Sequence, residues 1–355
     1  MNKMKSQKKL HAIGGKLVGI LLVLGIVLWI VIAAKGKNEN PISSTEFKLN
    51  TAVTINIYDS QDERILNGAM ELCDRYEQMF SRTLPDSEIS KLNNGMLKLT
   101  ENGYRVKKET FELIKKGIEY GKISDGAFDI SIEPVSSLWD FTSENKQIPE
   151  QSVLSDRLQS VGYGNVVLTE NENREEHFVQ FQKEGMGIEL GAIAKGYIAD
   201  RIKEYLLDQG VESALIDLGG NVLCVGNRPD GQPFRIGVQK PFKERNETVA
   251  VVEVSDRSVV SSGIYERYFE KDGKLYHHIL DPRTGYPYEN DLLSVTIFSD
   301  ASVDGDGVST TCYALGLEKG MELVDGMDDV QALFITKDGE LHFSKGFEEK
   351  VKIIK

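Results

Sequence analysis

The spacing of apolar positions predicts three amphipathic helices in the first two thirds of the chain. After Ser60-Gln-Asp-Glu63, which has the pattern of a capping box, apolar side chains recur every three or four residues as far as Phe80. The same spacing predicts a helix near 109–120 and another near 192–208, which ends at Gly210. Each helix has one apolar face, so each needs a layer to pack against.

Strand patterns dominate from Ala214 onward. The predicted strands are 47–58, 165–168, 178–181, 214–217, 234–239, 249–254, 268–271, 274–278 and 294–298. Asp272-Gly273 is the dipeptide of a type I′ hairpin turn, Asp338-Gly339 marks a second hairpin, and a helix through 309–315 ends at Gly316. Helices and strands are mixed without regular βαβ alternation, so we predict an α+β (mixed α/β) fold in one compact domain over 45–355.

The first 44 residues have a different character. Residues 1–16 are basic, 17–34 form the uncharged run LVGILLVLGIVLWIVIAA, and 35–44 are polar. As a helix the run is about 27 Å long, close to the hydrocarbon thickness of a bilayer. We predict a single-pass anchor in the cell membrane, a cytoplasmic tail, a linker and an extracytoplasmic domain. The alternative is a cleaved signal peptide, because Ala33 and Ala34 end the run with small residues.

Charge and cysteine content narrow the function classes. The net charge is −13, but residues 1–37 hold seven lysines and no acid, so the remainder carries −20. A body this acidic repels phosphate backbones, and we expect no nucleic-acid partner. The three cysteines match no metal-binding or disulfide spacing.

Two short motifs carry candidate chemistry, and each also has a purely structural explanation. Lys195 falls in the first turn of the helix near 192–208, where a cation opposes the helix dipole unless Glu189 or a ligand phosphate lies beside it. Asp306 and Thr310 stand four residues apart on one helix face. They could offer oxygen ligands to Mg²⁺, or the acid could cap the helix while the threonine bonds back to a carbonyl.

Other motifs are weaker. His277 and His278 follow one another on a strand, so at most one points into a given site, and no further His or Cys stands at zinc spacing. The turn at 217–221 is not a GxGxxG fingerprint, which disfavours a Rossmann site. Ser261-Ser-Gly263 is not a GxSxG nucleophile motif.

Seven segments, taken in order, resemble the ApbE family of FAD:protein FMN transferases. They are SRTLPDSEISKLN (81–93), DGAFDIS (125–131) with LWDF (138–141), IELGAIAKGYIADR (188–201), LIDLGGN (215–221), SSGIYERYF (261–269), HHILDPRTGYP (277–287) and DGVSTTCYALG (306–316). The resemblance covers about residues 45–320, and the order of the segments is far more specific than any one of them. The resemblance therefore outweighs the structural explanations above.

The resemblance implies an enzyme that uses Mg²⁺ to move the FMN half of FAD onto a threonine hydroxyl of a target protein, releasing AMP. It implies that the metal is held by the carbonyl of Ala192 and by Asp306 and Thr310, that Asp306 is also the base for the acceptor threonine, and that His278 is needed for transfer. The implied FAD contacts are Leu49, Thr83, Ala127, Phe128, Asp129, Glu189, Lys195 and Ile279. The implied acceptor is an exported or membrane redox protein.

The chain departs from the family pattern in two places. Leu49 and Thr83 stand where many relatives carry a methionine and an aromatic residue, and Asp304 precedes Asp306 closely enough to be an alternative ligand. The same site could also serve an Mg²⁺-dependent FAD pyrophosphatase that gives FMN and AMP, or an anchored FAD-binding protein without chemistry.

Overall fold

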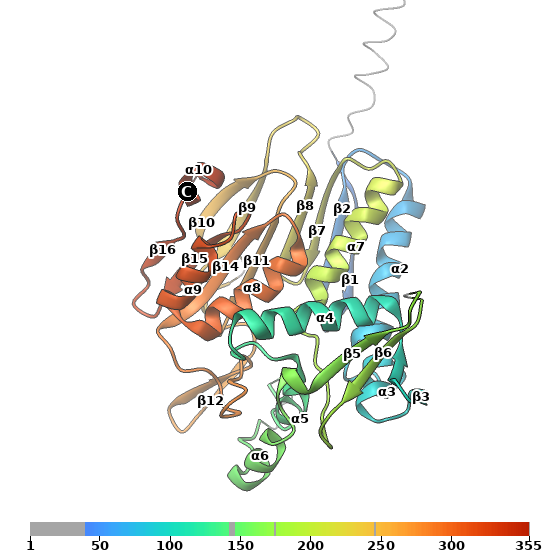
Figure 1. Cartoon of the computed structure of the whole chain (residues 1–355). Coiled ribbons are helices and arrows are strands. Elements are labelled where there is room, and N and C mark those ends of the chain that lie inside the picture. The colour runs from blue at the N-terminus through green and yellow to red at the C-terminus, as the bar shows by residue number, and fades with distance from the viewer. Residues whose placement is uncertain (1–39, 142–145, 174, 245, 355) are drawn as a thin grey trace, which may run out of the picture.

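The computed structural model describes residues 40–141, 146–173, 175–244 and 246–354 (Figure 1). The predicted basic tail and the apolar run at 17–34 lie outside these residues, and no helix in the described ranges is long and apolar enough to cross a membrane. Strand β1 (Ile42–Lys48) pairs with β2 (Thr51–Ile57) along its whole length. Residues 42–44, which their polar composition had assigned to the linker, therefore belong to the sheet.

An eight-stranded antiparallel sheet forms the centre of the molecule, in the order β1-β2-β7-β8-β11-β14-β15-β16. Its further strands are β7 (Ser213–Leu218), β8 (Asn221–Gly226), β11 (Ser258–Gly263), β14 (Leu292–Ser299), β15 (Gln331–Thr336) and β16 (Leu341–Phe343). Every pairing is between antiparallel strands, as expected for a fold without regular βαβ units.

Both faces of this sheet are covered (Figure 1). Helices α2 (Glu63–Phe80), α7 (Ala194–Asp208), α8 (Ser302–Leu315) and α9 (Leu317–Asp325) pack on one face, and β9 (Phe234–Gln239), β10 (Thr248–Val254) and β17 (Lys352–Ile353) pack on the other. Neighbouring residues of a central strand are therefore both buried: Ile297 faces the helices and Phe298 faces the small sheet. This explains why the central strands carry apolar runs rather than strict alternation.

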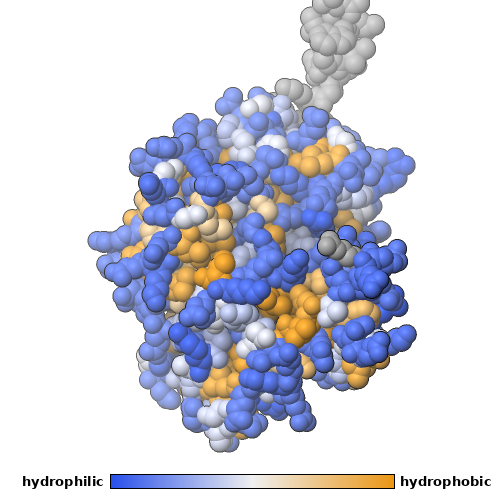
Figure 2. Space-filling model, in the orientation of Figure 1, coloured by the Kyte–Doolittle hydropathy of each residue, from blue (hydrophilic) through white to orange (hydrophobic). Residues whose placement is uncertain are grey.

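Smaller elements complete the domain. They are α3 (Glu88–Asn93), β3 (Leu99–Thr100), β4 (Gly103–Val106), α4 (Lys108–Ile123), η1 (Ile130–Ile132), α5 (Glu133–Ser136), α6 (Gln151–Leu158), η2 (Tyr163–Asn165), β5 (Val166–Glu170), β6 (His177–Phe181), β12 (Tyr268–Lys271), β13 (Lys274–His277) and α10 (Phe347–Lys350). The hairpin β12–β13 packs with α5 and α6 around Trp139 in a core of its own. Hydrophilic residues cover most of the face shown in Figure 2, with separate apolar areas between them.

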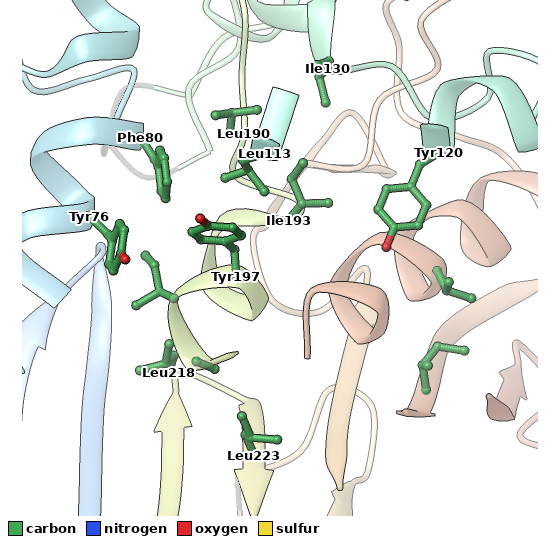
Figure 3. Packing of buried hydrophobic residues seen from close by; sticks show 14 of the residues in the cluster. Tyr76, Phe80, Leu113, Tyr120, Ile130, Leu190, Ile193, Tyr197, Leu218 and Leu223 are labelled. Atoms are coloured by element: carbon green, nitrogen blue, oxygen red, sulfur yellow. The ribbon is translucent and has the colours of Figure 1, made fainter. Parts of the chain in front are cut away.

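The main core holds α7 against α2. The ring of Tyr197 in α7 meets the rings of Tyr76 and Phe80 edge to face, at centroid distances of 5.8 and 5.5 Å (Figure 3). Such aromatic contacts add about 0.5–1.5 kcal/mol beyond the burial of area. The amino-terminal end of α7 is thereby held in place, and this is the end that carries Lys195.

The structure confirms the predicted mixed α/β fold and most of the predicted elements. The bounds of β9 and β12 match at both ends, and α7 begins two residues after the predicted start. Asp272 and Gly273 have φ values of 53° and 74°, as a type I′ turn requires.

Several local predictions were wrong. The single strand over 47–58 is a hairpin, because Leu49 and Asn50 both adopt positive φ at a turn without glycine. Helix α2 is capped by Asp62 rather than Ser60.

Candidate active site

Helix α8 begins at Ser302, ahead of the predicted helical run 309–315, and its amino terminus is capped from α7. The carboxylate of Asp200 accepts hydrogen bonds from the backbone N–H groups of Ser302 (2.7 Å) and Val303 (2.9 Å). The explanation of Asp306 as a helix cap is therefore wrong. Asp306 lies in the second turn of the helix, with its side chain free for another role.

The carboxylate of Asp306 is buried where α7, α8 and β8 meet. It is 5% exposed, and it accepts hydrogen bonds from the Gly196 N–H on Oδ2 (2.6 Å) and from Asn221 Nδ2 on Oδ1 (3.0 Å). Burial raises the pKa of Asp306, while the Lys195 ammonium and the two hydrogen bonds oppose that shift. The protein thus holds a desolvated carboxylate beside a cation.

Glycine at position 196 allows the two helices to approach this closely. A Cβ atom there would lie 2.2 Å from the backbone oxygen of Ser302 and 2.7 Å from the Cα of Val303. Because both contacts are to backbone, no side-chain rotation could relieve them. The close approach places the Gly196 N–H within reach of Asp306.

Three oxygen-bearing groups predicted to hold the metal belong to the segments that form this junction. The Ala192 carbonyl accepts no hydrogen bond from the described residues, since the Gly196 N–H that could reach it in a regular helix donates to Asp306 instead. Thr310 follows Asp306 by one helical turn, and its Oγ1 lies 3.1 Å from Ser262 Oγ. A carboxylate, a hydroxyl and a free carbonyl are the oxygen ligands that hard divalent cations take.

This donor set fits Mg²⁺ better than zinc. No cluster of three His, Cys, Asp or Glu side chains able to hold a metal occurs in the part of the chain that the structure describes. A cation here would keep coordination positions for water and ligand oxygens, as Mg²⁺ usually does.

The alternative ligand, Asp304, faces another direction. Its Oδ1 accepts a hydrogen bond from the Tyr120 hydroxyl (2.6 Å) and pairs with Lys116 (2.7 Å), both from α4. Two residues along a helix are turned by about 200°. The geometry therefore favours Asp306 over Asp304 at the junction.

Lys195 does not make the surface pair that would explain it structurally. Glu189 pairs instead with Arg82 (3.2 Å) and accepts a hydrogen bond from the Ser136 hydroxyl. Lys195 forms no ion pair with a carboxylate of the described residues, although it is close enough to influence the pKa values of both Asp306 and His278. Its charge is available to an anionic ligand.

His278 lies near the same cation, and its pKa is lowered from the usual histidine value. Its Nδ1 is 3.2 Å from the carbonyl oxygen of Arg267, and desolvation, together with Arg267, His277 and Lys195, lowers its pKa to about 3. His277 is buried separately, with Nε2 3.0 Å from the Tyr288 carbonyl. As expected for consecutive residues, the two rings contact different parts of the protein.

The remaining predicted flavin contacts differ in the neighbours that they touch. Tyr288 ties two of them together, since its hydroxyl donates to the Ala127 carbonyl (2.9 Å) and its N–H donates to the Ile279 carbonyl (3.0 Å). Phe128 is buried against the Tyr120 ring.

The carboxylate of Asp129 is used inside the protein. It accepts hydrogen bonds from the N–H and hydroxyl of Ser131 and from the Tyr163 N–H (2.7, 2.6 and 2.8 Å). Its geometry favours a structural role for that side chain.

Leu49 and Thr83 are not in hydrogen-bond or ionic contact with the other predicted residues within the described ranges. Leu49 occupies the β1–β2 turn, and the exposed Thr83 follows α2, next to the Arg82 that pairs with Glu189. The structure thus brings Lys195 close to Asp306, which shares helix α8 with Thr310.

Sequence reasoning missed four residues that contact the predicted site: Arg82, Ser136, Asn221 and Ser262. Arg82, Asn221 and Ser262 lie inside the quoted segments SRTLPDSEISKLN, LIDLGGN and SSGIYERYF, so their presence was visible. Their direction was not, because a strand end or a turn does not reveal what its polar side chains will face.

Comparison with known proteins agrees with the ordered segments. The family model described as the ApbE family matches residues 49–334. A protein of Klebsiella pneumoniae named FAD:protein FMN transferase is 36% identical over 83% of this chain and 89% of its own length. One of Treponema pallidum with the same name is 31% identical, over 88% of this chain and 89% of its own.

Solved structures share the fold. The crystal structure of an ApbE protein from Thermotoga maritima has a TM-score of 0.76 and 30% identity, covering 88% of this chain and 99% of that one. A flavin transferase ApbE from Vibrio cholerae has a TM-score of 0.75 and 25% identity, with the same coverage. With its segments, its fold and its relatives in agreement, this chain belongs to the ApbE family.

Proposed function

We propose that this chain is an FAD:protein FMN transferase that works at the junction of α7, α8 and β8. The observation that carries the proposal is the buried carboxylate of Asp306, which accepts the Gly196 N–H and lies close to Lys195. The Ala192 carbonyl, four residues before Gly196, accepts no hydrogen bond from the described residues. An acidic protein can bind the pyrophosphate of FAD only where cations outweigh its own charge. The junction provides one cation and a set of ligands for another.

The carbonyl of Ala192 and the side chains of Asp306 and Thr310 would hold Mg²⁺. When bound, Mg²⁺ would neutralise charge on the phosphate oxygens and on the departing AMP. Lys195 would contact a phosphate of FAD directly, since its ammonium has no carboxylate partner in the described residues. The amino terminus of α7 is the positive end of the helix dipole, so it would also attract a phosphate.

In the proposed reaction the hydroxyl oxygen of an acceptor threonine forms a bond to the phosphorus of the FMN half. The P–O bond of the pyrophosphate to AMP breaks, AMP leaves with that electron pair, and the hydroxyl proton goes to the carboxylate of Asp306. Because burial raises the pKa of Asp306, this carboxylate binds a proton more readily than a solvated aspartate does. His278 stays neutral and can donate or accept one hydrogen bond without adding charge.

Replacement of Asp306 by alanine tests this proposal. The full chain would be incubated with FAD, Mg²⁺ and a threonine-bearing acceptor peptide, and the peptide followed by mass spectrometry for the gain of FMN less water. Asp306→Ala should reduce transfer by at least about a hundredfold, because it removes a base and a metal ligand. Asp304→Ala is the matched control, since that acid contacts Tyr120 and Lys116 instead.

The products separate the alternatives. Transfer that is unchanged in Asp306→Ala would refute the assignment of the base and the metal ligand. Release of FMN and AMP with an unmodified peptide would identify a pyrophosphatase, and intact bound FAD would identify a binding protein.

We propose further that the domain is anchored in the cell membrane by residues 17–34 and acts on an exported or membrane redox protein. The apolar run and its preceding lysines support this location. The chain enters the domain at Ile42, beside the end of β2, where Tyr58 bonds to Ser213 just after α7. Lys195 lies at the opposite end of α7 from this contact, and the helix is about 21 Å long. Protease accessibility of the full chain in oriented vesicles would test the placement.

A further inference from the structure

We propose that Asn221 and Ser262 are positioning residues that aim oxygen lone pairs, rather than protons, at the space beside Asp306 and Thr310. This inference rests on the proposed function, because it concerns how the chain prepares that space for a divalent cation. Neither residue is a proposed ligand. The argument comes from the direction in which two chains of hydrogen bonds must run.

The first chain ends on the carboxylate of Asp306. A carboxylate only accepts, so Asn221 must present Nδ2 to it (3.0 Å) and turn Oδ1 toward Ser302. Ser302 Oγ then donates to that oxygen (2.8 Å) and receives a hydrogen bond from Ser258 Oγ (2.8 Å). Asn221, Ser302 and Ser258 are 0% exposed, so water cannot replace any of them.

This first series of hydrogen bonds fixes the orientation of the Asp306 carboxylate. Each of its oxygens accepts one N–H, from Asn221 or from Gly196, and keeps a further lone pair. Successive donors in a dry interior polarise one another in the same sense. Each oxygen of the carboxylate therefore keeps an electron pair for a further partner.

The second chain begins at Thr310 and runs away from it. Ser309 Oγ donates to the backbone carbonyl of Asp306 (3.0 Å), which can only accept. The proton of Ser309 is then used, so Ser262 must donate to Ser309 (2.7 Å), and Thr310 must donate to Ser262 (3.1 Å). This is the one assignment in which all three contacts are hydrogen bonds, and it leaves the lone pairs of Thr310 Oγ1 free.

Both chains therefore leave acceptors at the junction and remove donors from it. With the free Ala192 carbonyl, the proposed space receives oxygen electron pairs from two parts of the chain, helix α8 and the turn before α7. Such a set repels an anion alone and favours a hard cation. Lys195 supplies the separate positive charge that a phosphate needs, so the cation and the anion are expected to bind together.

The test uses Ser262, because its removal leaves no buried charge unpaired. In Ser262→Ala the Thr310 hydroxyl loses its acceptor and can turn its proton toward the cation. Mn²⁺ would be titrated into the purified full chain with FAD present, and free Mn²⁺ followed by its electron paramagnetic resonance signal. The dissociation constant should rise about three- to tenfold, as expected for one hydrogen bond.

Two further variants separate positioning from general damage. Ser262→Thr keeps the hydroxyl and should bind Mn²⁺ as the original chain does. Ser261→Ala is the matched control, because the neighbouring Ser261 bonds to Thr296 (2.8 Å) on the adjacent strand. Asn221→Ala should also raise the constant, and the Ser262 series decides if that variant does not fold.

The outcomes distinguish this inference from the proposed function. If the original chain transfers FMN and binds Mn²⁺, but Ser262→Ala binds it as tightly as Ser261→Ala, the positioning role is refuted and the transferase stands. If the original chain neither transfers FMN nor binds Mn²⁺, the proposed function fails, and this inference fails with it. A rise in Ser262→Ala that Ser262→Thr reverses supports the inference.

Discussion

Replacing Gly196 with alanine should destabilise the protein, although alanine is the better helix former. In an exposed helix interior this change would gain about 1 kcal/mol. In α7 the new Cβ would lie 2.2 Å from Ser302 O, 2.5 Å from Ser302 C and 2.7 Å from the Cα of Val303. All three atoms belong to the backbone of α8, so the helices themselves must separate.

The size of the effect follows from those distances. Ordinary contact begins near 3.4 Å, so α7 and α8 would have to move apart by about 1.2 Å. A movement of that size would stretch the 2.6 Å hydrogen bond from the Gly196 N–H to Asp306 beyond its useful range. Overpacking costs about 1–3 kcal/mol and a lost hydrogen bond to a carboxylate about 1.5–3, so the net loss should be about 2–5 kcal/mol.

Urea unfolding of the purified full chain, followed by circular dichroism, measures this change in the free energy of unfolding. Gly164→Ala is the matched control, because a Cβ there meets no atom within 4 Å and its φ is not positive; it should change stability by less than about 0.5 kcal/mol. Wherever the Gly196→Ala protein is folded, its rate of FMN transfer should be lower than that of the original chain at every Mg²⁺ concentration. A Gly196→Ala protein as stable and as active as the original would refute the reasoning about the helix junction.

Three further results are expected. Lys195→Ala should raise the KM for FAD about tenfold or more. The free energy of unfolding in urea should change by less than about 0.5 kcal/mol, because no ion pair is lost. An unchanged KM would contradict the contact between Lys195 and a phosphate. Burial raises the pKa of Asp200 to about 6, above its unfolded value of about 3.9, so the folded chain keeps this proton longer and stability should fall as pH rises from 4 to 6. Urea unfolding should show a flatter pH dependence in Asp200→Asn, and equal slopes would count against the shift. Because the pKa of His278 is lowered to about 3, a plot of kcat/KM against pH should show no inflection from this ring between pH 6 and 7. An inflection in that range that disappears in His278→Gln would contradict the lowered pKa.

The sequence was informative where a local pattern has only one structural solution. The apolar spacing of α7 and the Asp272-Gly273 turn were read correctly, because helical periodicity and type I′ geometry depend on a few neighbouring residues. The turn at Leu49 and Asn50 was missed, since it contains no glycine and its positive φ values give no composition signal.

Helix boundaries were harder to predict from the sequence where tertiary packing, rather than helix propensity, decided them. Helix α8 carries Gly305 and Gly307, which weaken a helix in isolation, and the sequence pattern indicated a helix only through 309–315. In the folded protein a Cβ at these positions would meet Val260 and Tyr120, and Asp200 caps the helix from α7. The helix begins early because of partners that are far away in sequence.

For the candidate site, too, some features follow from local sequence and others only from tertiary packing. By itself the sequence determined that Asp306 and Thr310 share a helix face, that Lys195 opens another helix, and that the ordered segments are those of one family. Only the tertiary structure decided that Asp306 rather than Asp304 faces the Gly196 N–H. A periodic pattern fixes which side chains lie together on one element, but the element that packs against them is set by long-range burial, and this decides what each polar atom meets.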